Sequence, residues 1–457
     1  MINTAFSNVF EELKWRGMVF DATPGCAETL VSDKLTCYIG FDPSARSLHI
    51  GNLIPIMGLV NMQRHGHTPI AIVGGGTGMI GDPGGRKDER QLLTREKIEE
   101  NVEGIRIQLA KFLDFKVKSN PAKLINNADW LLKLGLVDFL RDTGKHFTVN
   151  YMLDKESVKG RLDRESGISY TEFSYMLLQA YDSWKLYADH GCRLQMGGSD
   201  QWGNILAGVD LIKRVEQVAD AQGNVTGYTH GEPHAMVYPL VTTASGEKFG
   251  KSIGGAPTLD PAQTSPYRLF QFFLNTDDRD VIGYLKRFTL MGPADTAPLE
   301  EAVKTEPAKR EAQRRLASEV TSLVHGQSGL AQAQRVTEAV FQGKILELDP
   351  REMEDALQGA PGATLPRREF SGEGTSIQNL VLQAGIAGSA GEARRLISQG
   401  GLSLNGERVT DANARVTEKD LIGGKVVVLR RGTKTYYMVN VTDEGPPSQA
   451  LHNVKPQ

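Results

Sequence analysis

Short apolar runs alternate with helical patterns in the first half of the chain. Residues 37–41 (Cys-Tyr-Ile-Gly-Phe) predict a buried strand, and residues 42–44 (Asp-Pro-Ser) predict a turn. A helical pattern follows from about His49 to His65, and Pro69–Val73 predicts a second strand. Strand, helix and strand at this spacing indicate a right-handed βαβ crossover. We therefore predict an α/β domain with a doubly wound parallel sheet, in which ligands bind at the carboxyl ends of the strands.

The pattern becomes helical after Ser252 and changes again near Glu347. Ser265-Pro266 is typical of a helix start, and apolar residues recur at helical spacing beyond it, which predicts a helical domain over 253–346. Three prolines and four glycines within 347–375 predict a linker. A compact module of helices and strands is expected over 376–442, with a tail over 443–457.

Length and composition are those of an ordinary globular protein. A chain of 457 residues suggests roughly three folding units, and 40% hydrophobic with 23% charged residues excludes a wholly disordered chain. Because 52 Lys and Arg nearly balance 55 Asp and Glu, any nucleic-acid surface must be local. Residues 371–440 hold nine basic against six acidic residues, a local charge of +3. An RNA-binding face and an ordinary solvated face both account for this excess.

The three cysteines argue against a structural metal site. Cys26, Cys37 and Cys192 are far apart and form no C-x-x-C pair, which disfavours a zinc ribbon or a disulfide framework. No signal-like leader opens the chain, and its apolar runs are too short to span a bilayer. We expect a soluble protein of a reducing compartment, the cytoplasm, with no membrane partner and no metal ligands of its own.

Two glycine-containing motifs are decoys. Residues 76–81 match G-x-G-x-x-G, but turn residues at 82–85 follow at once, where a dinucleotide site needs a helix. Gly250-Lys251-Ser252 ends like a phosphate-binding P-loop, yet Ser245 stands where that loop requires glycine. We reject both interpretations.

Two other motifs have the chemistry to hold phosphates. His49-Ile50-Gly51-Asn52 lies at the start of the first predicted helix, where unpaired N–H groups favour an anion. Lys248-Phe249-Gly250-Lys251-Ser252 presents two lysines on a predicted loop that follows a strand over 236–241. Either motif alone is weak, since a histidine at a helix start is usually a cap and paired lysines are usually solvated. Their joint occurrence on one α/β domain is more specific.

These two motifs resemble the H-I-G-H and K-M-S-K-S signatures of the bacterial-type tyrosyl-tRNA synthetases, which are class I aminoacyl-tRNA synthetases. The similarity extends over nearly the whole chain, and its C-terminal segment resembles a small RNA-binding module shared with a ribosomal small-subunit protein. Further blocks that carry the resemblance are 38–43, 81–83, 175–182, 197–204 and 275–279.

The resemblance implies a tyrosine–tRNA ligase. The carboxylate of L-tyrosine would attack the α-phosphorus of ATP, and a hydroxyl of the terminal adenosine of tRNA(Tyr) would then attack the tyrosyl-adenylate. A carboxylate is ionised at pH 7, so the reaction needs positioning and charge stabilisation rather than a general base. Mg²⁺ is expected to accompany ATP, held mainly by phosphates and water, with no tightly bound cofactor and no DNA partner.

The resemblance also implies three groups of site residues. The group at the reacting phosphates is Ser44, His49, Asn52, Arg86, Arg90, Lys248 and Lys251. The tyrosine group is Tyr38, Asp82, Tyr175, Gln179, Asp182 and Gln201, of which Tyr38 and Asp182 would bond the phenolic hydroxyl. The ATP group is Gly40, Asp42, His49, Gly51, Gly198, Asp200 and Lys251. Two departures from the family pattern are Asn52, in place of a second histidine, and Ile39, where relatives can have cysteine.

For the whole chain, the resemblance implies a Rossmann-like catalytic domain over 1–252, an anticodon-side helical domain over 253–346 and an RNA-binding module over 376–442. It also implies a homodimer, with an interface insertion near 115–160 that includes Lys145–Leu153. Three alternatives stay open. The Tyr38 and Asp182 pair disfavours a tryptophanyl ligase, the helical and basic C-terminal regions disfavour a small-molecule nucleotidyltransferase, and the charged signatures disfavour a catalytically silent RNA-binding paralogue.

Overall fold

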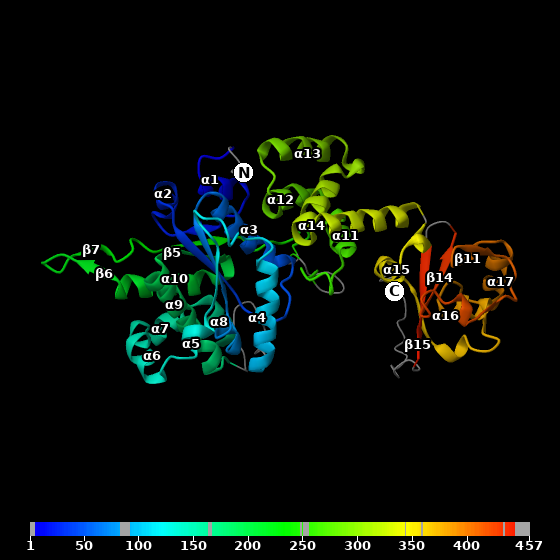
Figure 1. Cartoon of the computed structure of the whole chain (residues 1–457), viewed down its shortest axis with the longest axis horizontal. Helices are drawn as coiled ribbons and strands as arrows, with labels where there is room; N and C mark the ends of the chain where they lie inside the picture. Colours follow the sequence, from blue (N-terminus) through cyan, green and yellow to red (C-terminus); the bar gives the residue numbers. More distant parts are fainter. Residues whose placement is uncertain are drawn as a thin grey trace. The chain divides into compact units, whose positions relative to one another are not determined.

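The computed structural model describes residues 5–82, 92–162, 167–246, 249, 256–342, 344–357, 360–432 and 435–443 (Figure 1). Within these ranges the chain forms two compact units. The first contains the residues up to Ser265 and Leu269–Gly326, and the second contains Pro266–Arg268 and the residues from Gln327 onward.

A six-stranded sheet forms the centre of the first unit, in the order β1–β8–β5–β2–β3–β4. The short β1 pairs antiparallel with β8, and the other pairs are parallel. The strand order reverses between β2 and β5, which is where doubly wound sheets bind ligands. The predicted doubly wound parallel sheet is therefore confirmed. The strands are β1 Asp21–Ala22, β2 Thr36–Phe41, β3 Thr68–Val73, β4 Lys123–Asn126, β5 Cys192–Gly198 and β8 His234–Tyr238.

The two strands expected from the sequence lie at the centre of this sheet. Both are almost continuous apolar runs, as parallel strands covered on both faces should be. The helix expected between them begins as a short 3₁₀ turn, η1 Ile50–Asn52, and continues as α3 Leu53–Arg64. Gly66 follows with φ of +88°, a backbone conformation that ends a helix and favours glycine.

Helices surround the sheet and extend the first unit. A separate two-stranded hairpin, β6 Gln217–Ala219 and β7 Val225–Tyr228, precedes β8. The remaining elements up to β8 are α1 Val9–Trp15, α2 Cys26–Ser32, η2 Thr77–Met79, α4 Arg95–Leu109, α5 Ala128–Leu131, α6 Leu136–Asp142, η3 Gly144–His146, α7 Val149–Leu153, α8 Glu156–Leu162, α9 Tyr170–His190, η4 Ser199–Gln201 and α10 Trp202–Val215. After the sheet come α11 Pro266–Leu274, α12 Asp278–Phe288, α13 Pro293–Thr305, η5 Pro307–Lys309 and α14 Glu311–Gln342.

The boundary between the units falls inside α14, at a break in its geometry. Gly326 has φ of +73° and ψ of 179°, so the helix is interrupted there. The residues after Gly326 group with the second unit, where Val336 is buried beside α15 and β14. The division between the units thus differs from the boundary expected near residue 346.

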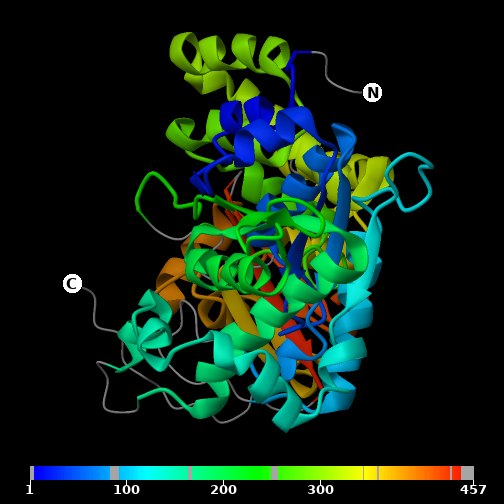
Figure 2. The same ribbon diagram turned by 90° about the vertical axis from the view of Figure 1, so that its left-hand side faces the viewer.

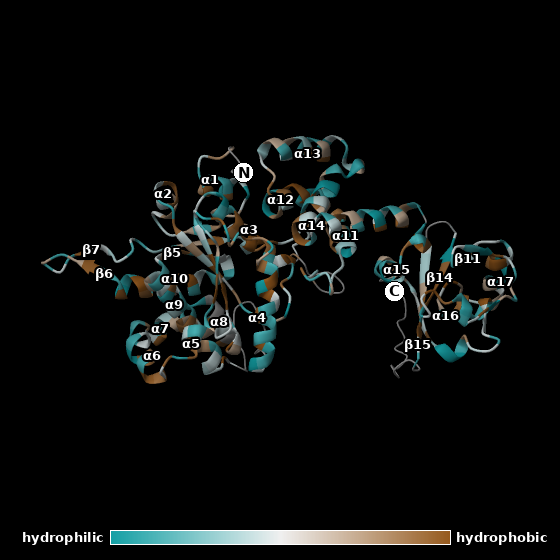
Figure 3. Ribbon diagram, in the orientation of Figure 1, coloured by the Kyte–Doolittle hydropathy of each residue, from teal (hydrophilic) through white to brown (hydrophobic). Residues whose placement is uncertain are grey.

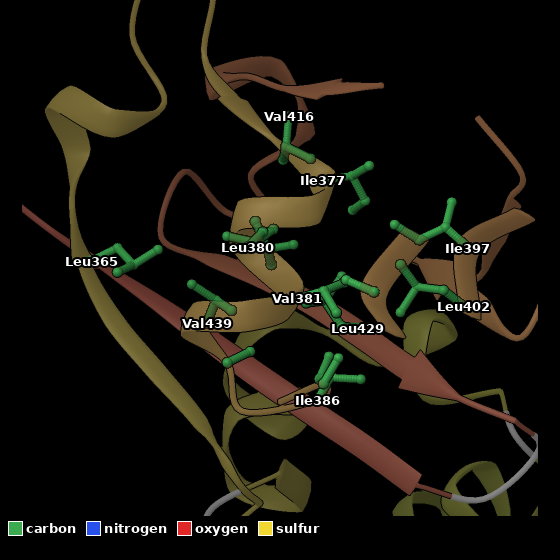
Figure 4. Packing of buried hydrophobic residues seen from close by; sticks show 14 of the residues in the cluster. Leu365, Ile377, Leu380, Val381, Ile386, Ile397, Leu402, Val416, Leu429 and Val439 are labelled. Atoms are coloured by element: carbon green, nitrogen blue, oxygen red, sulfur yellow. The ribbon is translucent and has the colours of Figure 1, made fainter. Parts of the chain in front are cut away.

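The second unit is built on a five-stranded sheet in the order β12–β11–β14–β15–β9. One face carries a buried core with α16 and α17, shown in Figure 4. The elements are η6 Ile345–Glu347, α15 Pro350–Leu357, β9 Gly362–Pro366, η7 Arg367–Glu369, β10 Thr375–Ser376, α16 Ile377–Gln383, α17 Ala390–Ser398, β11 Leu402–Leu404, β12 Glu407–Val409, β13 Arg415–Val416, η8 Glu418–Asp420, β14 Val426–Arg431 and β15 Thr435–Thr442.

The linker predicted over 347–375 is wrong, because this segment is part of the second unit. β9 pairs in parallel with β15, opposite Met438–Thr442. Leu365 and Phe370 belong to the core of the sheet, and Figure 4 shows Leu365 near Val439. Prolines and glycines misled the prediction, because Pro350 begins α15 and Gly362 and Pro366 are the end residues of β9, while Met353, Leu357 and Leu365 within these elements are buried. No helix of the described residues is long and apolar enough to cross a membrane.

Candidate active site

The main pocket of the first unit opens where the strand order reverses, between the carboxyl ends of β2 and β5. Its volume is about 210 Å³. All six residues expected to bind tyrosine line it, as do three expected to bind ATP. These residues are Tyr38, Asp82, Tyr175, Gln179, Asp182 and Gln201 from the first group, and Gly40, Asp42 and Gly198 from the second.

Helix α9 supplies three of the lining side chains. Tyr175, Gln179 and Asp182 are spaced by four and three residues, which places them on one face of the helix. Ser169 caps the start of α9 by accepting from the N–H of Glu172, and Gly191 ends it in the left-handed conformation. A long, capped helix therefore presents these polar groups to the pocket.

Asp182 is a buried carboxylate with both oxygens held in place. Trp130 Nε1 donates to Oδ1 at 2.7 Å, and Asn127 Nδ2 donates to Oδ2 at 2.8 Å. Burial raises the pKa of Asp182 to about 7, even though these two hydrogen bonds lower it. The carboxyl group therefore changes charge near neutral pH. Beside it, the hydroxyl of Tyr38 lies 2.6 Å from Ser183 Oγ.

Hydrogen bonds connect Asp182 to a second carboxylate, Asp42. Asn127 Nδ2 also donates to Thr77 Oγ1 at 3.0 Å, and that hydroxyl donates to Asp42 Oδ1 at 2.9 Å. Tyr175 donates its hydroxyl proton to Asp42 Oδ2 at 2.9 Å. Burial raises the pKa of Tyr175 well above its ordinary value, so the phenol stays a donor. The network holds both carboxylates at fixed positions around the pocket.

Amide side chains hold the third carboxylate. Gln201 Nε2 donates to Asp82 Oδ2 at 2.6 Å, and Asn204 Nδ2 donates to Gln179 Oε1 at 3.1 Å. An ammonium group entering here would meet acceptor oxygens from these side chains. The pocket thus has two groups of acceptors, the side chains of Asp82, Gln179 and Gln201, which could bind a cation, and the buried carboxylate of Asp182.

The first signature forms a reciprocal cap at the start of η1. His49 Nδ1 accepts from Gly51 N–H at 3.0 Å, and Asn52 Oδ1 accepts from His49 N–H at 3.0 Å. Because Nδ1 is an acceptor, the neutral imidazole carries its proton on Nε2. Asn52 uses its oxygen in the cap, so its NH₂ group is left as a donor. A Cβ on Gly51 would lie 2.7 Å from His49 Cε1, so a larger residue at this position would displace the imidazole from its cap.

The second signature lies mostly outside the described residues. Lys248, Lys251 and the basic residues Arg86 and Arg90 are among those not described, so their expected roles stay predictions. The chain that follows is hydrogen-bonded to the first signature. Ile50 N–H donates to Pro257 O at 2.9 Å, and Leu259 N–H donates to Leu48 O at 2.8 Å.

Two more expected residues lie at the surface. Ser44 and Asp200 are exposed and do not line the described pocket. Ile39 does line it, with an aliphatic side chain that has no hydrogen-bonding atom.

Comparisons with known proteins agree with this geometry. The profile of a family described as "tRNA synthetases class I (W and Y)" matches residues 31–342, and that of a "Tyrosine--tRNA ligase SYY-like C-terminal domain" matches residues 352–439. The tyrosine–tRNA ligase of Roseiflexus castenholzii is 48% identical over 95% of this chain and 100% of its own length. That of Bacillus caldotenax is 47% identical over 94% and 99%.

The chain belongs to the tyrosyl-tRNA synthetases of class I. Solved structures agree with this assignment. A C-terminally truncated mitochondrial tyrosyl-tRNA synthetase from Aspergillus nidulans is 30% identical and covers 74% of this chain and 95% of its own, with a TM-score of 0.66. Both of the relatives given above are tyrosine–tRNA ligases, so the tryptophanyl alternative is not favoured.

Sequence reasoning missed the residues that hold this synthetase site together. Asn127, Trp130 and Ser183 contact the expected residues but belong to none of the quoted motifs, and Thr77 lies in the 76–81 motif that we rejected as a dinucleotide site. One signal was available, since Asn126 and Asn127 follow a short apolar run and the carboxyl end of a parallel strand is a place for ligand-binding groups. The contacts of Trp130 and Ser183 depend on tertiary packing.

Proposed function

We propose that this chain is a tyrosine–tRNA ligase whose pocket at the carboxyl ends of β2 and β5 activates L-tyrosine with ATP. The tyrosine carboxylate attacks the α-phosphorus, the bond to the β-phosphate oxygen breaks, and pyrophosphate leaves. A hydroxyl of the terminal adenosine of tRNA(Tyr) then attacks the tyrosyl-adenylate and releases AMP.

The observation that carries the proposal is the buried Asp182 beside Tyr38. The phenolic O–H of tyrosine donates to the Asp182 carboxylate, and Tyr38, which lines the same pocket, bonds the phenolic oxygen. Phenylalanine would supply no further donor to this buried carboxylate beyond those of Asn127 and Trp130, and the missing hydrogen bond costs free energy. Asp82, Tyr175, Gln179 and Gln201 surround the ammonium group.

ATP binds toward the strand ends and the first signature. Gly40, Asp42, Gly51, Gly198 and Asp200 contact its nucleoside and inner phosphates. The Nε2 proton of His49 and the amide protons of Asn52 donate to phosphate oxygens, and Ser44 assists them. Lys248, Lys251, Arg86 and Arg90 neutralise the leaving pyrophosphate.

Mg²⁺ enters with ATP rather than on a protein site. Among the described residues no cluster of three or more His, Cys, Asp or Glu side chains could hold a metal ion. Phosphates and water are the ligands that magnesium prefers when it binds with a nucleotide. No tightly bound cofactor is part of the proposal.

The second unit serves tRNA binding, and the chain acts as a homodimer in the cytoplasm. The segment around α5–α7 exposes large apolar side chains, of which Leu136 and Val137 are 71% and 75% exposed, and Figure 3 shows a hydrophobic stretch at the start of α6. A second copy would cover this surface. Sedimentation should give twice the chain mass.

Amino-acid-dependent exchange between ATP and pyrophosphate tests the activity. We expect exchange with tyrosine and little with phenylalanine or tryptophan. Exchange only with tryptophan would identify the tryptophanyl alternative, and no exchange with any amino acid would point to a catalytically silent RNA-binding protein.

A further inference from the structure

Phe249, the residue between the two signature lysines, is inserted into an aromatic cluster of α11 and α12. Its ring stacks on Phe288 at 5.0 Å between centroids with 19° between the planes, and meets Tyr284 edge-on at 4.9 Å. Phe272 and Phe273 complete the cluster at 5.7 and 6.3 Å. Four rings from two helices therefore hold the one described side chain within the second signature.

The chain before Phe249 is attached to the same helix. Asp280, in the first turn of α12, accepts a hydrogen bond from Ala244 N–H at 2.9 Å. Phe249 N–H donates to Val241 O at 3.0 Å, which closes the loop between them. Asp280 and Phe288 are eight residues apart, about 12 Å along the helix. Ala244 therefore contacts α12 near its first residue, and Phe249 contacts α12 at its last residue.

The chain after the second signature is attached to the first. Pro257 and Leu259 exchange backbone hydrogen bonds with Ile50 and Leu48, and His49 forms a bridge with Thr258. Phe249 is thus bound to α12, and the described chain over 257–259 is bound to the first signature and the residue before it.

A buried ion cluster fixes α12 relative to the helix of the first signature. Arg16 at the end of α1 donates to the carbonyls of Lys286, Thr289 and Met291 around the end of α12. Its partner Glu12 also bonds His65 at 2.5 Å, just after the end of α3. Figure 1 and Figure 2 show α1 beside α12 from two directions.

We propose that Phe249 and Asp280 are positioning residues for the adenylation step, because they fix the second signature on α12 and so direct its lysines toward the first signature. The inference rests on the proposed function, in which those lysines act on the phosphates of ATP. Lys248 precedes Phe249 directly, and Lys251 follows it by two residues. We assign the role to ATP activation, because Phe249 and Asp280 are not among the residues that line the described pocket, where the tyrosine group lies.

Phe249→Ala in the full-length enzyme tests the role of the ring. We expect kcat/KM for ATP in tyrosine-dependent pyrophosphate exchange to fall about 10- to 100-fold, because misplacing a charged group by about 1 Å lowers the rate by this order of magnitude. The Kd for tyrosine and the single-turnover rate of transfer from preformed tyrosyl-adenylate to tRNA should change less than about twofold. Phe249→Met, which refills the cluster with a flexible apolar side chain, should restore most of the loss.

Two further variants separate positioning from general destabilisation. Tyr284→Phe keeps the ring and removes a buried hydroxyl that has no hydrogen-bond partner among the described residues, so it should leave exchange unchanged. Asp280→Ala should lower kcat/KM for ATP, whereas Asp280→Asn keeps an acceptor oxygen and should not.

Parallel losses of tyrosine affinity, exchange and transfer in Phe249→Ala would overturn the inference, because they would show a merely structural role. Unchanged ATP kinetics would overturn it as well. Failure of the proposed function itself is distinguishable, since the unmodified enzyme would then show no tyrosine-dependent exchange.

Discussion

At the scale of single residues, Asp182 combines two properties that oppose each other. Its burial excludes water from the carboxyl group and raises the pKa to about 7, while a phenolic hydroxyl donates more strongly to a charged acceptor than to a neutral one. The donors Asn127 and Trp130 stabilise the ionised form without neutralising it. In the proposed function, specificity for tyrosine therefore depends on a group whose pKa lies near neutral pH.

Replacing Asp182 should reduce specificity rather than general activity. We expect Asp182→Ala to lower kcat/KM for tyrosine about 10- to 100-fold, the range for one hydrogen bond to a charged group. Activity with phenylalanine should change much less, because that substrate does not use the carboxylate. Pyrophosphate exchange with each amino acid measures both values. Equal losses for the two would contradict the assigned role.

The same carboxylate predicts a pH dependence of tyrosine binding. Below about pH 7 Asp182 is mostly protonated and is a poorer acceptor, so the affinity for tyrosine should rise as pH increases from 6 to 8. Phenylalanine binding should not rise over this interval, and the trend for tyrosine should disappear in Asp182→Ala. Equilibrium titrations across the pH range measure it. A flat profile for tyrosine in the unmodified enzyme would argue against the phenol–carboxylate contact.

At the scale of elements, hydrogen bonds and ion pairs around Glu12 connect three helices, α1, α3 and α12. Burial alone would raise the pKa of Glu12, but hydrogen bonds and charges from His65, Arg16 and Arg64 outweigh it and lower the pKa to about 2. A carboxyl group whose pKa is lowered by folding stabilises the fold fully when the pH is above its pKa in the unfolded chain, which is 4.5 for Glu12. This contribution, on the order of 3 kcal/mol, is lost as pH falls from 4.5 through 2.

Removing the charge of Glu12 should destabilise the first unit. Glu12→Gln leaves the guanidinium of Arg16 buried without a charged partner, and such a change costs about 3 to 5 kcal/mol. Urea denaturation followed by fluorescence measures the loss, which should shrink as pH falls from 4.5 toward 2, because protonation of Glu12 in the unfolded chain removes the stabilisation over this interval. Glu103→Gln is the control, because the exposed pair of Glu103 and Arg106 should contribute nothing measurable. If Glu12→Gln left the free energy of unfolding unchanged, the cluster would not be a stabilising element.

Elements also show why the sequence predicted some parts of the structure and not others. The strand at 37–41 and the helix after it follow from continuous apolar runs and helical spacing, which are local signals. β9 has no such signal, since Gly362 and Pro366 are its end residues and its pairing with β15 joins segments far apart in the sequence. The site divides in the same way. The family resemblance named Asp182 and Tyr38, while Trp130 and Ser183 act through contacts that only the folded chain creates.

At the scale of the whole molecule, the first unit contains the proposed catalytic pocket and the second unit contains the proposed RNA-binding residues. The pocket, both signatures and the helix that anchors Phe249 belong to the first unit. The locally basic residues of 371–440 belong to the second. Because residues 347–375 fold with the second unit, the natural place to separate the two is Gly326, where α14 is interrupted.

Two truncations should therefore behave differently. A chain that ends at Gly326 keeps the pocket and loses the second unit as a whole, so it should stay monodisperse and catalyse tyrosine-dependent exchange. A chain that ends at Thr375 retains α15 and β9 without their partners and exposes Met353, Leu365 and Phe370, which are buried in the complete protein. That chain should bind a hydrophobic dye and aggregate, as checked by light scattering.

Charging of tRNA separates the roles of the units in the same experiment. Both truncated chains should charge tRNA poorly, because each lacks the sheet of the second unit, while the complete chain should charge it efficiently. The complete chain is also the control for dye binding and light scattering. If the chain ending at Thr375 were as monodisperse as the one ending at Gly326, residues 347–375 would not depend on β15, and the structural role assigned to them would be wrong. If the chain ending at Gly326 lost exchange along with charging, the pocket would need the second unit for its own integrity.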